Sequence, residues 1–196
     1  MRDVIMAPST PETVEQFLDW PGDDRAKHYE LVDGVVRAMS PASTTLATIQ
    51  GNLAVLIGSH LRASGSPCRL LVTPGVIPRM NAARNFRIPD LGVTCAPDAE
   101  RQIDMPDPIL LVEILSPSNE ADIWSNIWTY GTLPSLLDVL IVHSTKVTVQ
   151  LLSRGPDGTW PDNAVKFNRA DSVRLPSIDL ACPVDAFYAG TRFADP

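Results

Sequence analysis

Apolar residues recur at helical spacing in the first third of the chain. Between residues 43 and 63 they fall three or four positions apart, at Leu46, Ile49, Leu53, Ile57 and Leu61. This stripe predicts a long amphipathic helix over residues 43–63. Gly65 follows directly afterwards, and glycine is the residue type that most commonly ends a helix.

Two shorter helices are predicted near residues 14–18 and over residues 120–130. The first has Thr10, which can cap a helix, and then Pro11, which suits a first helical position. The second has apolar residues at helical spacing after a proline-containing turn.

Short apolar runs elsewhere predict β-strands. The pair Asp33-Gly34 between two such runs indicates a hairpin with a two-residue turn. The other runs are residues 68–73, 75–79, 87–95, 108–115, 136–143 and 146–152, followed by short strands and a final turn or short helix before residue 188. The order of helix, hairpin, long helix, strands, helix and strands predicts a mixed α/β layer architecture.

One apolar run contains a carboxylate. Residues 108–115 are almost wholly apolar, which is typical of a central strand buried on both faces, yet Glu113 lies inside the run. An unpaired buried carboxylate is costly and needs a metal ion, a cation or a proton. The other interpretation is a glutamate at the strand end that points to solvent or pairs with an arginine.

Asp90 opens the preceding predicted strand, directly after Pro89. By itself a Pro-Asp pair is typical of a turn. If Glu113 lies opposite in the next long strand, the two carboxylates repel each other unless a cation lies between them. Mg²⁺ prefers such oxygen ligands, so Asp90 and Glu113 together predict a metal site.

Composition limits the class of protein. The chain has 196 residues, a length that suits one domain with a core large enough to fold without disulfides. Lys and Arg total 16 against 23 Asp and Glu, which gives a net charge of −7. This balance argues against a general nucleic-acid coat and leaves only a local basic patch for contact with nucleic acid.

The cysteines and the amino terminus favour a cytoplasmic protein. Cys68, Cys95 and Cys182 are odd in number and far apart, which fits a reducing cytosol and argues against a disulfide framework. Residues 1–10 have no apolar core of signal-peptide length. The longest uncharged stretch, residues 38–61, is too polar to span a membrane.

Several short motifs together resemble a known family. The chain resembles the PD-(D/E)-x-K nuclease superfamily and, more closely, its Uma-type restriction endonuclease family. The motifs that carry the resemblance are YELVDG at 29–34, MSP at 39–41, IPDL at 88–91, VEILSPS at 112–118, and Asp122 and Tyr130 after them. The likeness covers residues 13–152, which we take as the core of a single domain over residues 1–196, with residues 153–196 as a C-terminal extension.

The resemblance implies a restriction-endonuclease-like fold, in which a mixed sheet of about five strands is flanked by helices. It implies that Asp90 and Glu113 bind Mg²⁺ (or Mn²⁺), with the main-chain carbonyl of Ile114 as a third ligand and Glu30 near the same site. The implied reaction is hydrolysis of phosphodiester bonds in nucleic acid, with DNA as the expected partner. The implied assembly is a homodimer.

The sequence departs from the family pattern at the motif lysine. The strict motif position holds Leu115, and the other position used in this family, one helical turn after Asp122, holds Asn126. Asn126 could hold a water by a hydrogen bond but brings no positive charge; its other interpretation is an ordinary polar helix residue. No Lys or Arg occurs between residues 102 and 145.

Three functions therefore stay open. The first is a metal-dependent endonuclease with Asn126 in place of lysine. The second is a catalytically inactive nuclease-fold protein that acts as a binding or regulatory module, and the third is another phosphate chemistry on the same scaffold.

Other polar residues could serve the same site. Arg79, Arg84 and Arg87 precede Asp90 and could contact phosphate, although a solvated loop is their more ordinary role. Gln50 on the long helix could reach the site or stay at the helix surface.

Overall fold

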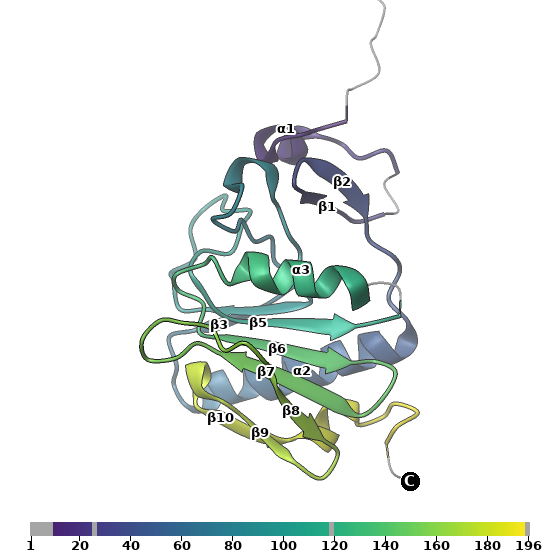
Figure 1. Cartoon of the computed structure of the whole chain (residues 1–196), viewed down its shortest axis with the longest axis vertical. Helices are drawn as coiled ribbons and strands as arrows, with labels where there is room; N and C mark the ends of the chain where they lie inside the picture. Colours follow the sequence, from purple (N-terminus) through teal and green to yellow (C-terminus); the bar gives the residue numbers. More distant parts are fainter. Residues whose placement is uncertain (1–9, 25–26, 118–119, 195–196) are drawn as a thin grey trace, which may run out of the picture.

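A mixed sheet forms the frame of the structure (Figure 1). The computed structural model describes residues 10–24, 27–117 and 120–194, without the side chains of residues 120–122. Within this part of the chain the sheet has six strands, in the spatial order β3 (Arg69–Val72), β4 (Leu91–Thr94), β5 (Pro108–Leu115), β6 (Asp138–His143), β7 (Thr148–Ser153) and β8 (Val165–Asn168). Only β5 and β6 pair in parallel among these strands. The predicted mixed α/β class is confirmed, with one strand more than expected.

Two helices cover opposite faces of the sheet (Figure 1). Helix α2 (Thr44–Ala63) is the long predicted helix, and the Ser43 hydroxyl caps it by accepting from the Leu46 amide at 3.2 Å. Helix α3 (Glu120–Tyr130) packs on the other face.

Strand β5 is buried on both faces, as its sequence predicts. Val112 and Ile114 pack in the apolar cluster under α2, whereas Leu111 and Leu115 pack in the cluster under α3. Because side chains alternate along a strand, Glu113 projects toward the α3 face.

The C-terminal segment is part of the main core. Strands β9 (Ser172–Leu175) and β10 (Leu180–Pro183) form a separate two-stranded sheet, and short 3₁₀ helices at η2 (Pro176–Ile178) and η3 (Val184–Tyr188) border it. Val173, Phe187 and Tyr188 are buried in the cluster under α2. The segment predicted as an extension therefore completes the apolar layer on that face.

The amino-terminal part forms a small unit above α3 in Figure 1. Helix α1 (Val14–Asp19) is capped by Thr13, not by Thr10 as predicted. Thr13 and Gln16 cap each other reciprocally, so two helix-end donors are satisfied at once and this start is preferred.

The predicted hairpin is present after α1. Strands β1 (Tyr29–Val32) and β2 (Val35–Ala38) pair in antiparallel fashion around Asp33 and Gly34. Both turn residues have positive φ, 50° and 82°. This is the type I′ geometry that Asp-Gly favours.

One predicted strand is wrong. Residues 75–79 form no ladder, and only isolated bridges join Gly75 to Asp104 and Val76 to Arg87. The ring of Phe86 lies so close to Gly75 that a Cβ there would be 2.1 Å from it. The segment is therefore a loop pressed against neighbouring residues, and the short 3₁₀ helix η1 (Ala82–Arg84) follows it.

No helix in the described ranges has the length and apolar character that crossing a membrane requires.

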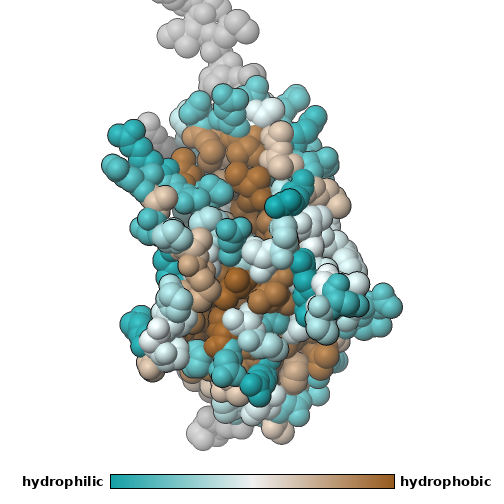
Figure 2. Space-filling view, turned by 90° about the vertical axis from the view of Figure 1, so that its left-hand side faces the viewer, coloured by the Kyte–Doolittle hydropathy of each residue, from teal (hydrophilic) through white to brown (hydrophobic). Residues whose placement is uncertain are grey.

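Apolar side chains reach the surface on one side of the molecule. Figure 2 views the side that lies at the left of Figure 1, and apolar residues form a broken band down its middle, bordered by hydrophilic residues. Large apolar side chains that are exposed on the described chain include Trp128 on α3, which is 54% exposed. The homodimer stays a prediction.

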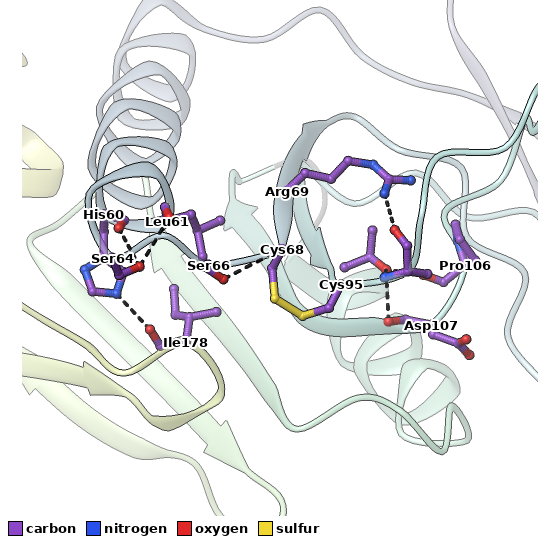
Figure 3. The surroundings of a disulfide bond; sticks show 12 residues. His60, Leu61, Ser64, Ser66, Cys68, Arg69, Cys95, Pro106, Asp107 and Ile178 are labelled. Carbon is purple, nitrogen blue, oxygen red and sulfur yellow. Dashed lines mark hydrogen bonds between the residues drawn. A yellow bond between two sulfur atoms is a disulfide. The ribbon is translucent and has the colours of Figure 1, made fainter.

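The cysteine pattern argues against a disulfide framework, but the structure contains one disulfide. Cys68 and Cys95 form a disulfide (Figure 3). Cys182 is free and buried. Because Arg69 pairs with Thr94 in the β3–β4 ladder, the next positions outward bring the two cysteines face to face. The two cysteines are 27 residues apart in the sequence, so their pairing follows only from the register of β3 against β4. The cysteine count therefore no longer supports the predicted reducing compartment.

The disulfide predicts a stability change on reduction. Opening a cross-link between residues 27 apart should lower the free energy of unfolding by about 3 kcal/mol, measured by urea titration with and without reductant. The variant Cys68→Ser/Cys95→Ser is the control and should not respond to reductant. The denatured, unreduced wild type should present one thiol, that of Cys182; three titratable thiols would contradict the disulfide.

Candidate metal and catalytic site

The antiparallel pairing of β4 and β5 brings the two predicted carboxylates together. Leu91 pairs with Val112, so Asp90, just before β4, comes beside the carboxyl end of β5. There the Asp90 Oδ2 atom accepts a hydrogen bond from the Ile114 main-chain amide at 2.6 Å. Asp90 and Glu113 are therefore neighbours, as the sequence predicts.

Burial makes both carboxylates reluctant to ionise. Glu113 is 5% exposed, and Asp90 is partly buried. Burial raises the pKa of Asp90 to about 6, although the Ile114 amide opposes this rise. Burial first and the Asp90 charge second raise the pKa of Glu113 well above its usual range. Two such carboxylates side by side favour either protons or a cation.

Tyr130 fixes the orientation of Glu113. Its hydroxyl, carried by the last residue of α3, donates to the Glu113 Oε1 atom at 2.8 Å, and its side chain is fully buried. Burial and the Glu113 charge raise the pKa of Tyr130, so the phenol keeps its proton and stays a donor. The helix that the sequence places after the motif thus contributes directly to the site.

Glu30 approaches the site from the hairpin. Leu31 and Phe86 exchange two main-chain hydrogen bonds of 2.9 Å, which fasten β1 to the loop before β4. The Glu30 charge helps to raise the pKa of both Glu113 and Tyr130, so Glu30 acts electrostatically on the pair.

The donor set suits a hard cation. Over the residues that the structure describes, no three His, Cys, Asp or Glu side chains form a metal-binding group. The carboxylate pair of Asp90 and Glu113 still fits Mg²⁺, which is commonly held by one or two carboxylates and keeps several waters. The proposed Ile114 carbonyl ligand stays a prediction.

The side-chain oxygen of Asn126 is engaged by an arginine. The Asn126 Oδ1 atom accepts from the Arg87 Nη1 atom at 2.6 Å. Arg87 is only 1% exposed, so the expectation of a solvated loop is wrong for this residue. It holds for Arg79 and Arg84, which are exposed. Asp122 precedes Asn126 by one turn of α3, but its side chain lies outside the described residues.

No feature of the sequence pattern singles out Asn85. This fully buried amide accepts both from the Arg87 Nε atom at 3.1 Å and from the Asp33 main-chain amide at 3.0 Å. It also donates to the Asp33 carboxylate at 2.9 Å. Asn85 thereby connects the hairpin turn to Arg87, and only the tertiary structure shows this connection.

Gln50 reaches the site from the other face of the sheet. Its Nε2 atom donates to the main-chain oxygen of Asp90 at 2.9 Å. Of the two roles open for Gln50, the structure therefore shows contact with the site, through the main chain of Asp90.

The raised pKa of Asp90 predicts how stability depends on pH. The folded protein binds this proton more tightly than the unfolded chain, since the pKa rises from 3.8 to about 6. In the absence of divalent metal, the free energy of unfolding therefore includes a stabilising contribution from the protonated Asp90. This contribution is fully present below about pH 4 and is lost as the pH rises through about 6.

The variant Asp90→Asn removes this loss. In chelator at about pH 8 it should be more stable than wild type by about 1–3 kcal/mol, and close to wild type near pH 4. Urea titrations at both pH values measure the difference, and Asp179→Asn, on an exposed carboxylate paired with Arg174, is the control. Equal stability of Asp90→Asn and wild type at high pH would contradict the prediction.

Known proteins are similar to this chain in sequence or in fold. The model of the Uma2 family, described as "Putative restriction endonuclease", matches residues 14–185, which extends past the core boundary predicted at residue 152. An uncharacterized protein of Synechocystis sp. (strain PCC 6803), slr1290, is 34% identical over 189 residues, which are 95% of this chain and 96% of that protein.

A solved structure is also similar. It is described as a putative nuclease belonging to DUF820 from Anabaena variabilis, and it matches with a TM-score of 0.74 at 18% identity, covering 91% of this chain and 98% of that one. At this identity the likeness shows the fold, which confirms the restriction-endonuclease-like architecture. The match to the family model over most of the chain shows more: the chain belongs to the Uma2 family of nuclease-like proteins.

Proposed function

We propose that this protein is an endonuclease that hydrolyses phosphodiester bonds with the help of Mg²⁺ (or Mn²⁺), and that DNA is its substrate. The observation that carries the proposal is the pair of Asp90 and Glu113, two carboxylates buried side by side at the end of a central strand. Such a pair is costly without a cation. Membership of a nuclease-like family supports the same chemistry.

Asp90 and Glu113 would hold the ion, with the main-chain carbonyl of Ile114 as the proposed third ligand. When bound, the ion would supply Lewis-acid stabilisation of the phosphate and would lower the pKa of a water. This role needs both carboxylates ionised, and a divalent cation favours that form against the burial that opposes it.

The side chains around the pair would keep it in position. Tyr130 holds one oxygen of Glu113, and the Ile114 amide holds one oxygen of Asp90. Gln50 holds the Asp90 main chain. A site fixed in this way loses little entropy when the reacting groups meet.

Glu30 and Asn126 are the two further candidates for catalytic roles. Glu30 adds a third carboxylate whose charge acts on Glu113. The Asn126 side-chain amide nitrogen could donate to a water, while its oxygen accepts from Arg87.

Asn126 also favours the second candidate function. An asparagine brings no positive charge to the helix position where the resemblance to the family implies a lysine. A catalytically inactive protein that binds a partner through the same fold would retain the core and could lose cleavage. Metal binding and cleavage therefore have to be measured separately.

The proposal predicts metal binding and cleavage by the same residues. Wild type should bind Mg²⁺ or Mn²⁺ in calorimetry, and Glu113→Gln and Asp90→Asn should weaken binding by about 10- to 100-fold, because each removes a charged ligand. Closed circular DNA tests endonucleolytic cleavage directly, and linear DNA and RNA test the substrate class. Asp179→Asn, an exposed carboxylate variant, is the control and should behave as wild type.

The outcomes separate the candidates. Metal-dependent nicking that both site variants abolish supports the endonuclease. Metal binding without cleavage of any of these substrates favours the binding module. If wild type neither binds metal nor cleaves, the proposal is wrong.

A further inference from the structure

We propose that Arg87 supplies a positive charge to the reacting phosphate, and that Asn126 serves to hold the Arg87 guanidinium in place. The inference rests on the proposed nuclease function. Arg87 and Asn126 would thus act as one pair. Arg87, in the loop before β4, carries the positive charge, and Asn126, on α3, accepts a hydrogen bond from its guanidinium.

The main chain fixes where Arg87 begins. Arg87 and Val76 exchange two main-chain hydrogen bonds of 2.8 Å, which hold the loop before β4 at this point. From there the side chain reaches α3, where Nη1 donates to Asn126 at 2.6 Å, while Nε donates to Asn85 at 3.1 Å. Two separate acceptors therefore determine both the position and the orientation of the guanidinium.

Both acceptors are neutral, although Arg87 is almost wholly buried. Among the described residues, no carboxylate makes an ion pair with Arg87. A buried guanidinium without a direct counter-ion is costly and cannot lose its proton. A purely structural role would be served at lower cost by an apolar side chain of similar size.

Helix α3 brings the Arg87 guanidinium toward the carboxylate pair. Asn126, which accepts from Nη1, and Tyr130 are four residues apart on α3 and so lie on one face of the helix. The Tyr130 hydroxyl donates to Glu113 at 2.8 Å. The guanidinium is therefore held about one helical turn from the contact with Glu113, where a permanent cation would face a phosphate bound to the proposed ion.

Phosphate hydrolysis gains from a cation fixed in this way. Negative charge on the phosphate oxygens must be stabilised in the transition state, and a preorganised cation in a site that excludes water is worth more there than in bulk water. Arginine also suits phosphate because its planar fork presents several donors at once.

Asn126 completes the arrangement because it accepts without adding charge. A lysine at position 126 would bring its ammonium group toward the guanidinium that Asn126 now binds, and two cations would repel each other. The geometry therefore indicates that the positive charge can come from residue 87 or from residue 126, but not from both.

A charge-transfer experiment tests the pair. The variants are Arg87→Met, Asn126→Lys and the double variant Arg87→Met/Asn126→Lys, measured for kcat and KM with saturating Mg²⁺ on DNA. We expect Arg87→Met to lower kcat by about 100-fold with little change in KM. Asn126→Lys alone should give no gain, and the double variant should recover kcat by about tenfold or more over Arg87→Met.

Controls separate charge from packing. Arg87→Lys keeps the charge and should retain more activity than Arg87→Met, whereas a purely structural role would make the two variants equal in kcat. Lys166→Met removes an exposed cation on β8, three strands from β5, and should leave kcat unchanged. Wild-type kcat in a folded Arg87→Met protein would overturn the inference.

A second variant covers the case in which Arg87→Met does not fold. Asn126→Ala, at a partly exposed helix position, removes the acceptor and leaves the charge. We expect kcat to fall by about tenfold in a protein that still folds, with a lower unfolding midpoint because one donor of the buried guanidinium loses its acceptor. An unchanged kcat would overturn the role assigned to Asn126.

The pair can also be tested if wild type proves to cleave nothing. The effects of Arg87→Met and Asn126→Lys on the unfolding equilibrium should then be strongly non-additive, because the lysine is repelled only while Arg87 is present. Non-additivity without cleavage would support the pairing while the nuclease function fails. Additive effects would overturn the pairing itself.

Discussion

Two carboxylates that share an apolar environment are the constraint on which the site depends. Asp90 and Glu113 repel each other, and burial makes the charged form of each more costly. Two hydrogen-bond donors hold these carboxylates: the Tyr130 hydroxyl donates to Glu113, and the Ile114 amide donates to Asp90. These donors lower the cost of ionisation only in part. The proposed divalent cation would offset the remaining cost.

A polar path links the amino-terminal hairpin to helix α3. It runs from the Asp33 turn through Asn85 and Arg87 to Asn126. The first and last steps join elements that are distant in sequence, so the hairpin that carries Glu30 is held in a fixed relation to the carboxylate pair. The same path carries a buried arginine to the helix. The hydrogen bonds that fasten the hairpin therefore also hold the Arg87 guanidinium against α3.

The mixed sheet brings these parts to one end. Strands β4 and β5 are antiparallel, so the beginning of β4 lies beside the end of β5. Strands β5 and β6 are parallel, and α3 connects them across one face. Helix α2 closes the opposite face and still reaches Asp90 through Gln50. The sheet topology thus gathers residues from both of its faces and from the hairpin at one end.

The sequence by itself determined the order of the elements, because hydrophobic periodicity and the Asp33-Gly34 turn are local signals. It also determined the carboxylate pair, since Glu113 interrupts an apolar strand. The tertiary structure alone decided the partners of Arg87, the role of Asn85 and the Cys68–Cys95 disulfide. Those contacts depend on strand register and on how a loop docks against a helix. Register and docking are set by the packing of the whole sheet, which no short stretch of sequence encodes.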